Sequence, residues 1–162
     1  MGLTKLNNSS LNAVTAAGLP SGTVLQVIYS EASSSNVNMS GSSWTDVGLT
    51  AVITPTSTSS KILVLFNPQF RIQNSSSDCG MGWQILRSGT VVRESATYYH
   101  TYLYGGSGQE VEFRGTDSFN HTDTPSSTSA LTYTFKGRLH NGVARTNDQG
   151  NKCMVTLLEI AA

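Results

Sequence analysis

Short runs of hydrophobic residues recur from Gly22 to the end of the chain, separated by stretches rich in Gly, Pro, Ser and Asn. In two of these runs polar and apolar residues alternate. Residues 110–114 place Val111 and Phe113 on one face and charged side chains on the other, and residues 131–135 repeat the pattern. A strand with one dry face and one wet face is what an antiparallel β-sandwich requires. The pattern therefore predicts an all-β domain.

Other runs differ from this alternation. Residues 61–66 are almost continuously apolar, which indicates a central strand. Residues 82–86 and 90–93 flank Arg87-Ser88-Gly89, a compact Gly-containing connection that is typical of a β-hairpin. The whole pattern predicts about nine or ten strands and no helix. Further candidate strands are residues 24–29, 49–54, 98–104 and 154–160.

The sequence divides into two parts, a short N-terminal segment of residues 1–20 and a β domain of residues 21–162. Apolar residues in the first segment are scattered among small polar ones without a regular period, and Pro20 closes it. Two interpretations stay open at this point. The segment is either a frayed terminus or an extended arm that docks onto a neighbouring chain or a larger assembly.

Charge restricts the range of partners. Charged residues make up 12% of the 162 residues, about half of the roughly 25% found in ordinary globular domains. The 10 basic and 10 acidic residues cancel, so we expect neither nucleic acid nor an anionic membrane as a partner. No run reaches the roughly 20 apolar residues of a membrane span. Residues 1–6 lack the apolar core of a signal peptide, so we expect assembly in a cytoplasm.

Cys79 and Cys153 are the only cysteines. Two are too few for a disulfide-stapled mini-domain, and their spacing does not match a metal site. We expect both to be reduced, because a cytoplasm keeps thiols reduced. Cys153 lies in an apolar run, so we expect it to act as a small core residue.

Several polar residues have the side chains of catalytic or metal sites. Ser118, His121 and Asp123 are the residue types of a hydrolase triad, but they fall within one short polar stretch that we interpret as a loop. His121 and Asp123, with His140 and Asp148, are likewise a weak match to a metal site. We therefore expect no metal and no cofactor.

Glu110 and Glu112 are candidates for a different chemistry. Two residues apart on a strand, they share one face at a separation of roughly 7 Å. That separation overlaps the range of inverting glycosidases. We favour the simpler interpretation, a solvated strand face that discourages edge pairing.

A group of aromatic residues precedes the Gly-rich stretch 105–108. On a strand, Tyr98, His100, Tyr102 and Tyr104 would share one face while Tyr99 points the other way. Such a stripe is either core or subunit interface, or a recognition surface in which tyrosine rings pack and their hydroxyls bind a ligand. These five residues are the candidate ligand-binding site.

Four segments together carry a resemblance to a known family. Residues 20–162 resemble the distal domains of tail fibre proteins from tailed bacteriophages, and more weakly the trimeric jelly rolls of the C1q and tumour necrosis factor class. The segments are Gly22-Thr23-Val24-Leu25-Gln26-Val27, Trp44-Thr45-Asp46-Val47, Ile53-Thr54-Pro55 through Lys61-Ile62-Leu63-Val64, and Val155-Thr156-Leu157-Leu158-Glu159-Ile160.

The resemblance implies an antiparallel β-sandwich of jelly-roll type over residues 21–162. It also implies a homo-oligomer, specifically a trimer, in a virion assembled in the host cytoplasm. Residues 1–20 would bind other virion proteins, and loops would meet a host surface glycan or protein. We expect no catalytic residues. The alternatives are a capsid decoration protein and a carbohydrate-active enzyme that uses Glu110 and Glu112.

Overall fold

The computed structural model describes residues 19–75, 77–96 and 100–162. In this part of the chain no helix is both long and apolar enough to cross a membrane. The described residues form antiparallel strands and one short 3₁₀ turn, η2 (Asp148–Gly150). The strands are β1 (Val24–Glu31), β2 (Val37–Met39), β3 (Thr45–Ile53), β4 (Lys61–Asn67), β5 (Gln69–Asn74), β6 (Cys79–Arg87), β7 (Thr90–Glu94), β8 (Thr101–Leu103), β9 (Val111–Thr116), β10 (Phe119–Asp123), β11 (Leu131–His140), β12 (Val143–Thr146) and β13 (Met154–Ile160).

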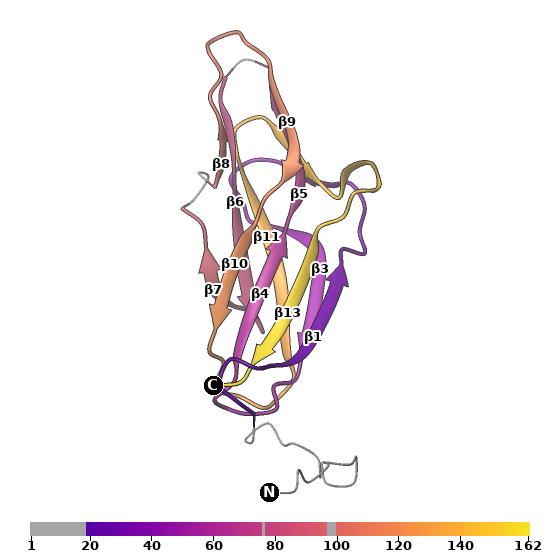
Figure 1. Cartoon of the computed structure of the whole chain (residues 1–162). Helices are drawn as coiled ribbons and strands as arrows, with labels where there is room; N and C mark the ends of the chain where they lie inside the picture. Colours follow the sequence, from indigo (N-terminus) through magenta and orange to yellow (C-terminus); the bar gives the residue numbers. More distant parts are fainter. Residues whose placement is uncertain (1–18, 76, 97–99) are drawn as a thin grey trace, which may run out of the picture.

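Two sheets pack face to face and define the topology. One has the order β1-β13-β4-β10, and the other has the order β3-β11-β6-β7, with β8 also paired to β6. Figure 1 shows β8 and β7 one above the other along the same edge of β6. The chain thus passes between the sheets as two Greek keys, which is the jelly-roll arrangement. The predicted fold class is confirmed.

A third sheet extends the first one. Its order, β2-β12-β5-β9, repeats the order β1-β13-β4-β10 strand for strand. Each strand of the third sheet is separated along the chain from its counterpart in the first sheet by a short break. Between β4 and β5 this break is the single residue Pro68. Proline has no N–H to give to a ladder, so pairing stops there. Figure 1 shows β5 above β4 and β9 above β10, so the sandwich is elongated at this end.

The core lies between the inner faces of the sheets. Its largest fully buried side chains include Trp83, Tyr133, Phe66 and Phe135. The Phe66 and Phe135 ring centroids are 4.5 Å apart, and Trp83 meets Phe66 edge-on at 5.8 Å. Tilted and edge-to-face contacts are the favoured aromatic geometries. The predicted central strand, residues 61–66, is confirmed as β4, which lies between β13 and β10.

A buried asparagine joins the two sheets where β12 ends. Asn147 is fully buried and has φ of 57°, a left-handed conformation that Asn tolerates better than most residues. Its Nδ2 donates to the Val47 carbonyl of β3 at 2.8 Å, and its Oδ1 accepts from the Cys153 N–H at 2.8 Å. Both polar ends of the side chain are therefore satisfied across the sandwich.

The cysteines match their predicted state. Cys79 and Cys153 are buried free thiols, and Cys153 belongs to the core cluster. Burial is the main cause that raises the pKa of Cys153, to about 11. Burial also raises the pKa of Cys79. Both therefore stay protonated at neutral pH.

The structure corrects one interpretation and adds three strands. Residues 118–123 were expected to form a loop, but residues 119–123 are strand β10, paired with β4. The stretch is a strand because Phe119 and Asp123 face inward while the polar Asn120 and Thr122 stay exposed. The short strands β2, β5 and β12 were not predicted.

The predicted arm falls almost entirely outside the described residues. Only Leu19 and Pro20 of residues 1–20 are described. At Pro20 the chain turns, with the Thr23 N–H donating to the Pro20 carbonyl at 3.2 Å. Thr23 and Gly22 then pair with Ala161, so the first strand begins beside the last one.

Candidate functional site

The predicted aromatic site is only partly described. Tyr98 and Tyr99 lie outside the described residues. The His100 ring meets Phe119 edge-on at 5.1 Å, whereas the Tyr102 ring stacks at 6.1 Å on His140 of β11. Tyr104 is 88% exposed. The three described residues thus have three different environments, and ligand binding by this group stays a prediction.

A carboxylate that sequence reasoning missed lies beneath this strand. Asp117 Oδ2 accepts hydrogen bonds from Trp83 Nε1 at 2.8 Å and from Thr101 Oγ1 at 2.6 Å. His100 Nε2 lies 3.9 Å from the same oxygen. A buried indole N–H needs a partner, so Asp117 satisfies the core tryptophan and ties β8 to β6.

The residues of the triad pattern have structural partners instead. Asp123 accepts two hydrogen bonds from Arg87 Nη1, at 2.7 and 2.8 Å, and one from the Tyr133 hydroxyl at 2.7 Å. Ser118 Oγ accepts from Asn120 Nδ2. Burial lowers the pKa of His121. No three His, Cys, Asp or Glu side chains within the described ranges are grouped to hold a metal ion.

The two glutamates of the glycosidase alternative lie on the outer face of the third sheet. Glu112 accepts hydrogen bonds at 2.7 Å from Arg71 and from Arg114, and these bonds lower its pKa to about 2. Glu110 accepts from Gln73 Nε2 at 2.7 Å. A general acid must hold a proton at the working pH. Glu112 is ionised there, which argues against the acid role.

These glutamates border a row of arginines that sequence reasoning also missed. Arg145, Arg71 and Arg114 lie directly opposite one another on β12, β5 and β9. Asn38 of β2 continues the row and accepts from Arg145 Nε at 2.8 Å. Like charges directly opposite one another on a sheet repel. This row, Asn38-Arg145-Arg71-Arg114, is called the arginine row below.

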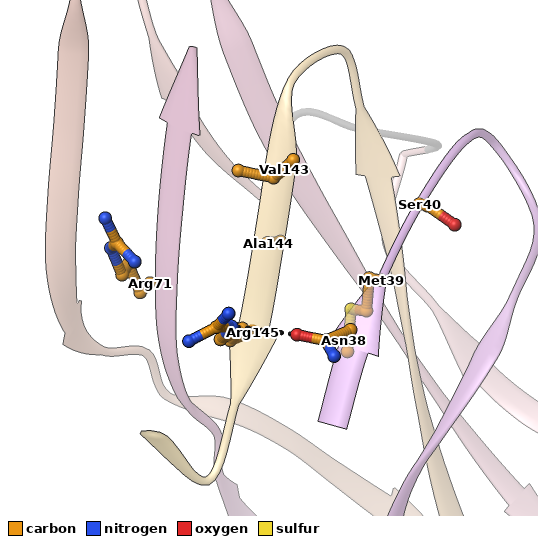
Figure 2. A pocket seen from close by; sticks show the side chains of 7 residues that line it. All are labelled: Asn38, Met39, Ser40, Arg71, Val143, Ala144 and Arg145. Atoms are coloured by element: carbon orange, nitrogen blue, oxygen red, sulfur yellow. Dashed lines mark hydrogen bonds between the residues drawn. The ribbon is translucent and has the colours of Figure 1, made fainter. Parts of the chain in front are cut away.

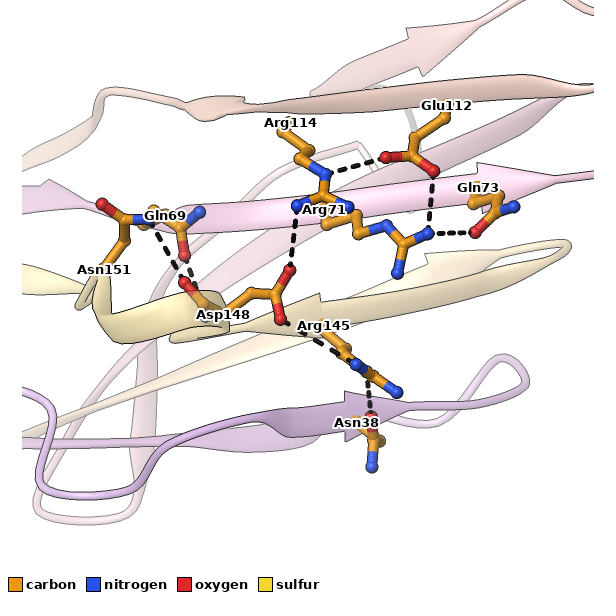
Figure 3. Close-up of polar contacts among 9 residues, drawn as sticks. All are labelled: Asn38, Gln69, Arg71, Gln73, Glu112, Arg114, Arg145, Asp148 and Asn151. Carbon is orange, nitrogen blue, oxygen red and sulfur yellow. Dashed lines mark hydrogen bonds and ion pairs between the residues drawn. The ribbon is translucent and has the colours of Figure 1, made fainter.

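Two carboxylates offset the repulsion, as Figure 3 shows. Glu112 bridges Arg71 and Arg114. Asp148, which is 4% exposed, lies 3.8 Å from Arg114 Nη1 and 3.9 Å from Arg145 Nη1. Those two distances exceed a hydrogen bond. Arg145 is thus the most weakly neutralised member of the row.

A groove of about 280 Å³ opens beside the arginine row. Figure 2 shows the Arg145 side chain between Asn38 of β2 and Arg71 of β5, with Val143 beyond it on β12. Val143 is 57% exposed and gives the groove an apolar wall. The lining residues are Asn38, Met39, Ser40, Arg71, Val143, Ala144 and Arg145.

The outer face of the β1-β13-β4-β10 sheet is the third surface of interest, because its central positions are apolar. Val27, Leu158 and Leu63 lie opposite one another across three strands. The next outward row is Tyr29, Thr156 and Leu65. Val27 and Tyr29 are each 56% exposed. These two rows are called the apolar face below.

The outer face of the opposite sheet is more polar, although Val52 and Val91 are exposed on it. One row across it is Asp46, Lys136, Gln84 and Glu94, and Gln84 donates to Glu94 at 2.7 Å. Thr134 lies in the centre of the next row. The two sheets of one sandwich therefore differ in their outer faces: the central rows of the β1-β13-β4 face are mostly apolar, whereas the row through Lys136 is polar.

Comparison with known proteins finds no family for this chain and only distant likeness to solved structures. No protein-family model matches the chain, and no curated protein sequence does. Among solved structures, the IBDV T13 viral particle matches with a TM-score of 0.48 and 12% identity, over 84% of this chain and 31% of that chain. The infectious bursal disease virus VP2 subviral particle matches with a TM-score of 0.38 and 13% identity, over 85% and 37%.

Dimeric latent PorU from Porphyromonas gingivalis is also similar, with a TM-score of 0.32 and 8% identity, over 87% of this chain and 14% of that chain. The chain thus spans well under half the length of each of these proteins. Such low similarity transfers no function to this chain.

Proposed function

We propose that this chain is a non-catalytic structural subunit of a virus particle, of the bacteriophage tail fibre kind, and that it works as a closed homotrimer. The observation that carries the proposal is the apolar face. Exposed apolar rows on a sheet mark a surface that another molecule covers. The trimer and the tail fibre assignment come from the resemblance of residues 20–162.

The partner on this face is a second copy of the chain. The two rows around Leu158 contain no charged residue, so like faces can meet without burying like charges. The formal net charge of zero also leaves little repulsion between subunits. Closed rings of identical subunits remove such surfaces from water.

The segments that carry the resemblance also meet in the folded chain. Glu159 accepts hydrogen bonds from Gln26 and from Thr56, so three of the four resembling segments share one cluster. This cluster lies on the strands of the apolar face, since Gln26 pairs with Glu159 in the β1-β13 ladder. Most of the resembling segments thus belong to the sheet whose outer face we propose to be the interface.

The test compares two matched variants in the same fold. Leu158→Glu places a charge in the centre of the apolar face, and Thr134→Glu places the same charge on the outer face of the opposite sheet. Burying an unpaired carboxylate in an interface costs several kcal/mol, so the first variant should become monomeric and the second should not. Sizing chromatography with light scattering measures both. If the two variants had equal masses, the proposal that the apolar face is the interface would be wrong.

In the tail fibre proposal, residues 1–20 attach the subunit to other virion proteins, and exposed loops contact the host. Deleting residues 1–19 should leave the sandwich folded, as checked by circular dichroism, and should reduce incorporation into particles. Normal incorporation would contradict the attachment role. Immunogold labelling separates the two structural assignments, because fibre subunits occur in few copies at the tail and decoration subunits in many copies on the head.

A further inference from the structure

We infer that the groove beside the arginine row binds the carboxylate of an acidic sugar. The inference rests on the proposed attachment function only for the identity of the partner, a host surface glycan. Binding itself depends on Arg145, Arg71, Asn38 and Val143, none of which lies on the apolar face.

The groove holds unused donors for an anion. Arg145 is 47% exposed in its side chain. Of its five N–H groups, only the one on Nε is donated within hydrogen-bond distance to a described residue. Arg71 Nε is buried and has no partner among the described residues. Arg145 thus offers free guanidinium N–H groups to a planar anion, and Arg71 lies directly opposite it on β5.

The surroundings of the groove favour an anion with a single negative charge. Glu112 and Asp148 already face the row, and Glu110 is close to Arg71 through Gln73. These three carboxylates equal the three arginines of the row in formal charge, so a dianionic phosphate would be repelled more than a carboxylate that binds the weakly paired Arg145. A carboxylate also fits the bidentate geometry of a guanidinium.

The rest of the groove fits a sugar ring. The Asn38 amide and the Ser40 hydroxyl line one side and offer donors and acceptors for ring hydroxyls. Val143 offers an apolar wall to the C–H face of the ring. The volume of about 280 Å³ lies just below the roughly 300–1,000 Å³ of drug-sized pockets. One saccharide unit therefore fits better than a long chain.

The experiment titrates the full chain with three probes by calorimetry: methyl glucuronide, methyl glucoside and glucose 6-phosphate. We expect the glucuronide to bind and the neutral glucoside to bind at least tenfold more weakly. Arg145→Gln should weaken glucuronide binding about tenfold to a hundredfold, since it removes a charge-assisted hydrogen bond. Arg93→Gln is the matched control, because Arg93 lies over the Phe119 ring, outside the groove, and it should bind as the native chain does.

A second variant tests the groove independently, in case Arg145→Gln does not fold. Val143→Glu leaves every arginine in place and adds a carboxylate to the exposed wall, so it should also abolish glucuronide binding. Equal binding of the glucoside, tighter binding of the phosphate, or no binding of the glucuronide would each overturn the inference. Light scattering on the same samples separates the proposals. A trimer that does not bind refutes only the sugar site, and a monomer that binds refutes only the oligomer.

Discussion

The buried carboxylate of Glu159 gives the sharpest prediction about stability. Glu159 is fully buried on β13. Its Oε1 accepts from the Thr56 N–H at 2.7 Å and from Thr56 Oγ1 at 2.8 Å, and its Oε2 accepts from Gln26 Nε2 at 2.6 Å. Glu159→Gln keeps the size of the side chain but replaces one of the accepting oxygens with a donor.

The new amide nitrogen has no good orientation. If it takes the Oε2 position it meets the Gln26 amide, donor against donor. Gln26 cannot rotate its amide without cost, because Nε2 also donates to the Thr54 carbonyl at 2.7 Å. Leaving one part-buried donor unpaired costs about 1–3 kcal/mol. We therefore expect a loss of about 2 kcal/mol in the free energy of unfolding, or roughly 4–8 °C in Tm for a chain of this size.

The pH dependence of this loss is a second check on the same variant. Burial alone would raise the pKa of Glu159, but the hydrogen bonds it accepts outweigh burial and lower its pKa below the ordinary 4.5. A lowered folded pKa means that the ionised carboxylate stabilises the fold above the unfolded pKa and that this stabilisation is lost as pH falls through the folded pKa. The difference between the native chain and Glu159→Gln should thus be constant from pH 6 to 8 and shrink below about pH 4.5.

Urea unfolding of both chains across this pH range measures the difference. Glu94→Gln is the matched control, because Glu94 accepts a similar hydrogen bond from Gln84 but is exposed, and surface substitutions usually change stability by less than about 0.5 kcal/mol. A Glu159→Gln chain as stable as the native chain at pH 7, or a difference that does not vary with pH, would refute the reasoning.

Three further predictions concern the interior. Asp117→Ala leaves the buried Trp83 indole unpaired, so urea unfolding followed by fluorescence should show a loss of about 1–3 kcal/mol; an unchanged midpoint would contradict this. Asn147→Ala removes two buried hydrogen bonds at a left-handed residue and should cost roughly 3 kcal/mol in the same assay. Reducing agent should leave Tm unchanged, because Cys79 and Cys153 are free; a fall in Tm would indicate a disulfide, which usually contributes about 2–4 kcal/mol.

The sequence predicts strands best where the apolar run is long. Residues 61–66 and 154–160 both match strands, β4 and β13, because each is apolar on two faces and needs no further signal. β5 was missed although Pro68 precedes it and Phe70 and Ile72 alternate inward, since polar residues such as Arg71 occupy every other position. β12 is only four residues long, too short for a period to show.

The surfaces are harder to predict because they depend on register. Arg71, Arg114 and Arg145 are far apart in the sequence, and only the pairing of β12, β5 and β9 brings them into one row. The apolar face likewise requires the order β1-β13-β4, which joins the first strand to the last. The local alternation of polar and apolar residues indicates on which face of a strand a residue lies. It does not indicate which residues lie beside it on the neighbouring strands.

The mass of the purified chain in solution tests the central claim most directly. Sedimentation equilibrium at micromolar concentration measures it without assumptions about shape. We predict a single species with three times the 17.3 kDa of one chain, because the exposed apolar rows centred on Leu158 are covered by neighbouring copies. A species with the mass of one chain across this concentration range would contradict the account.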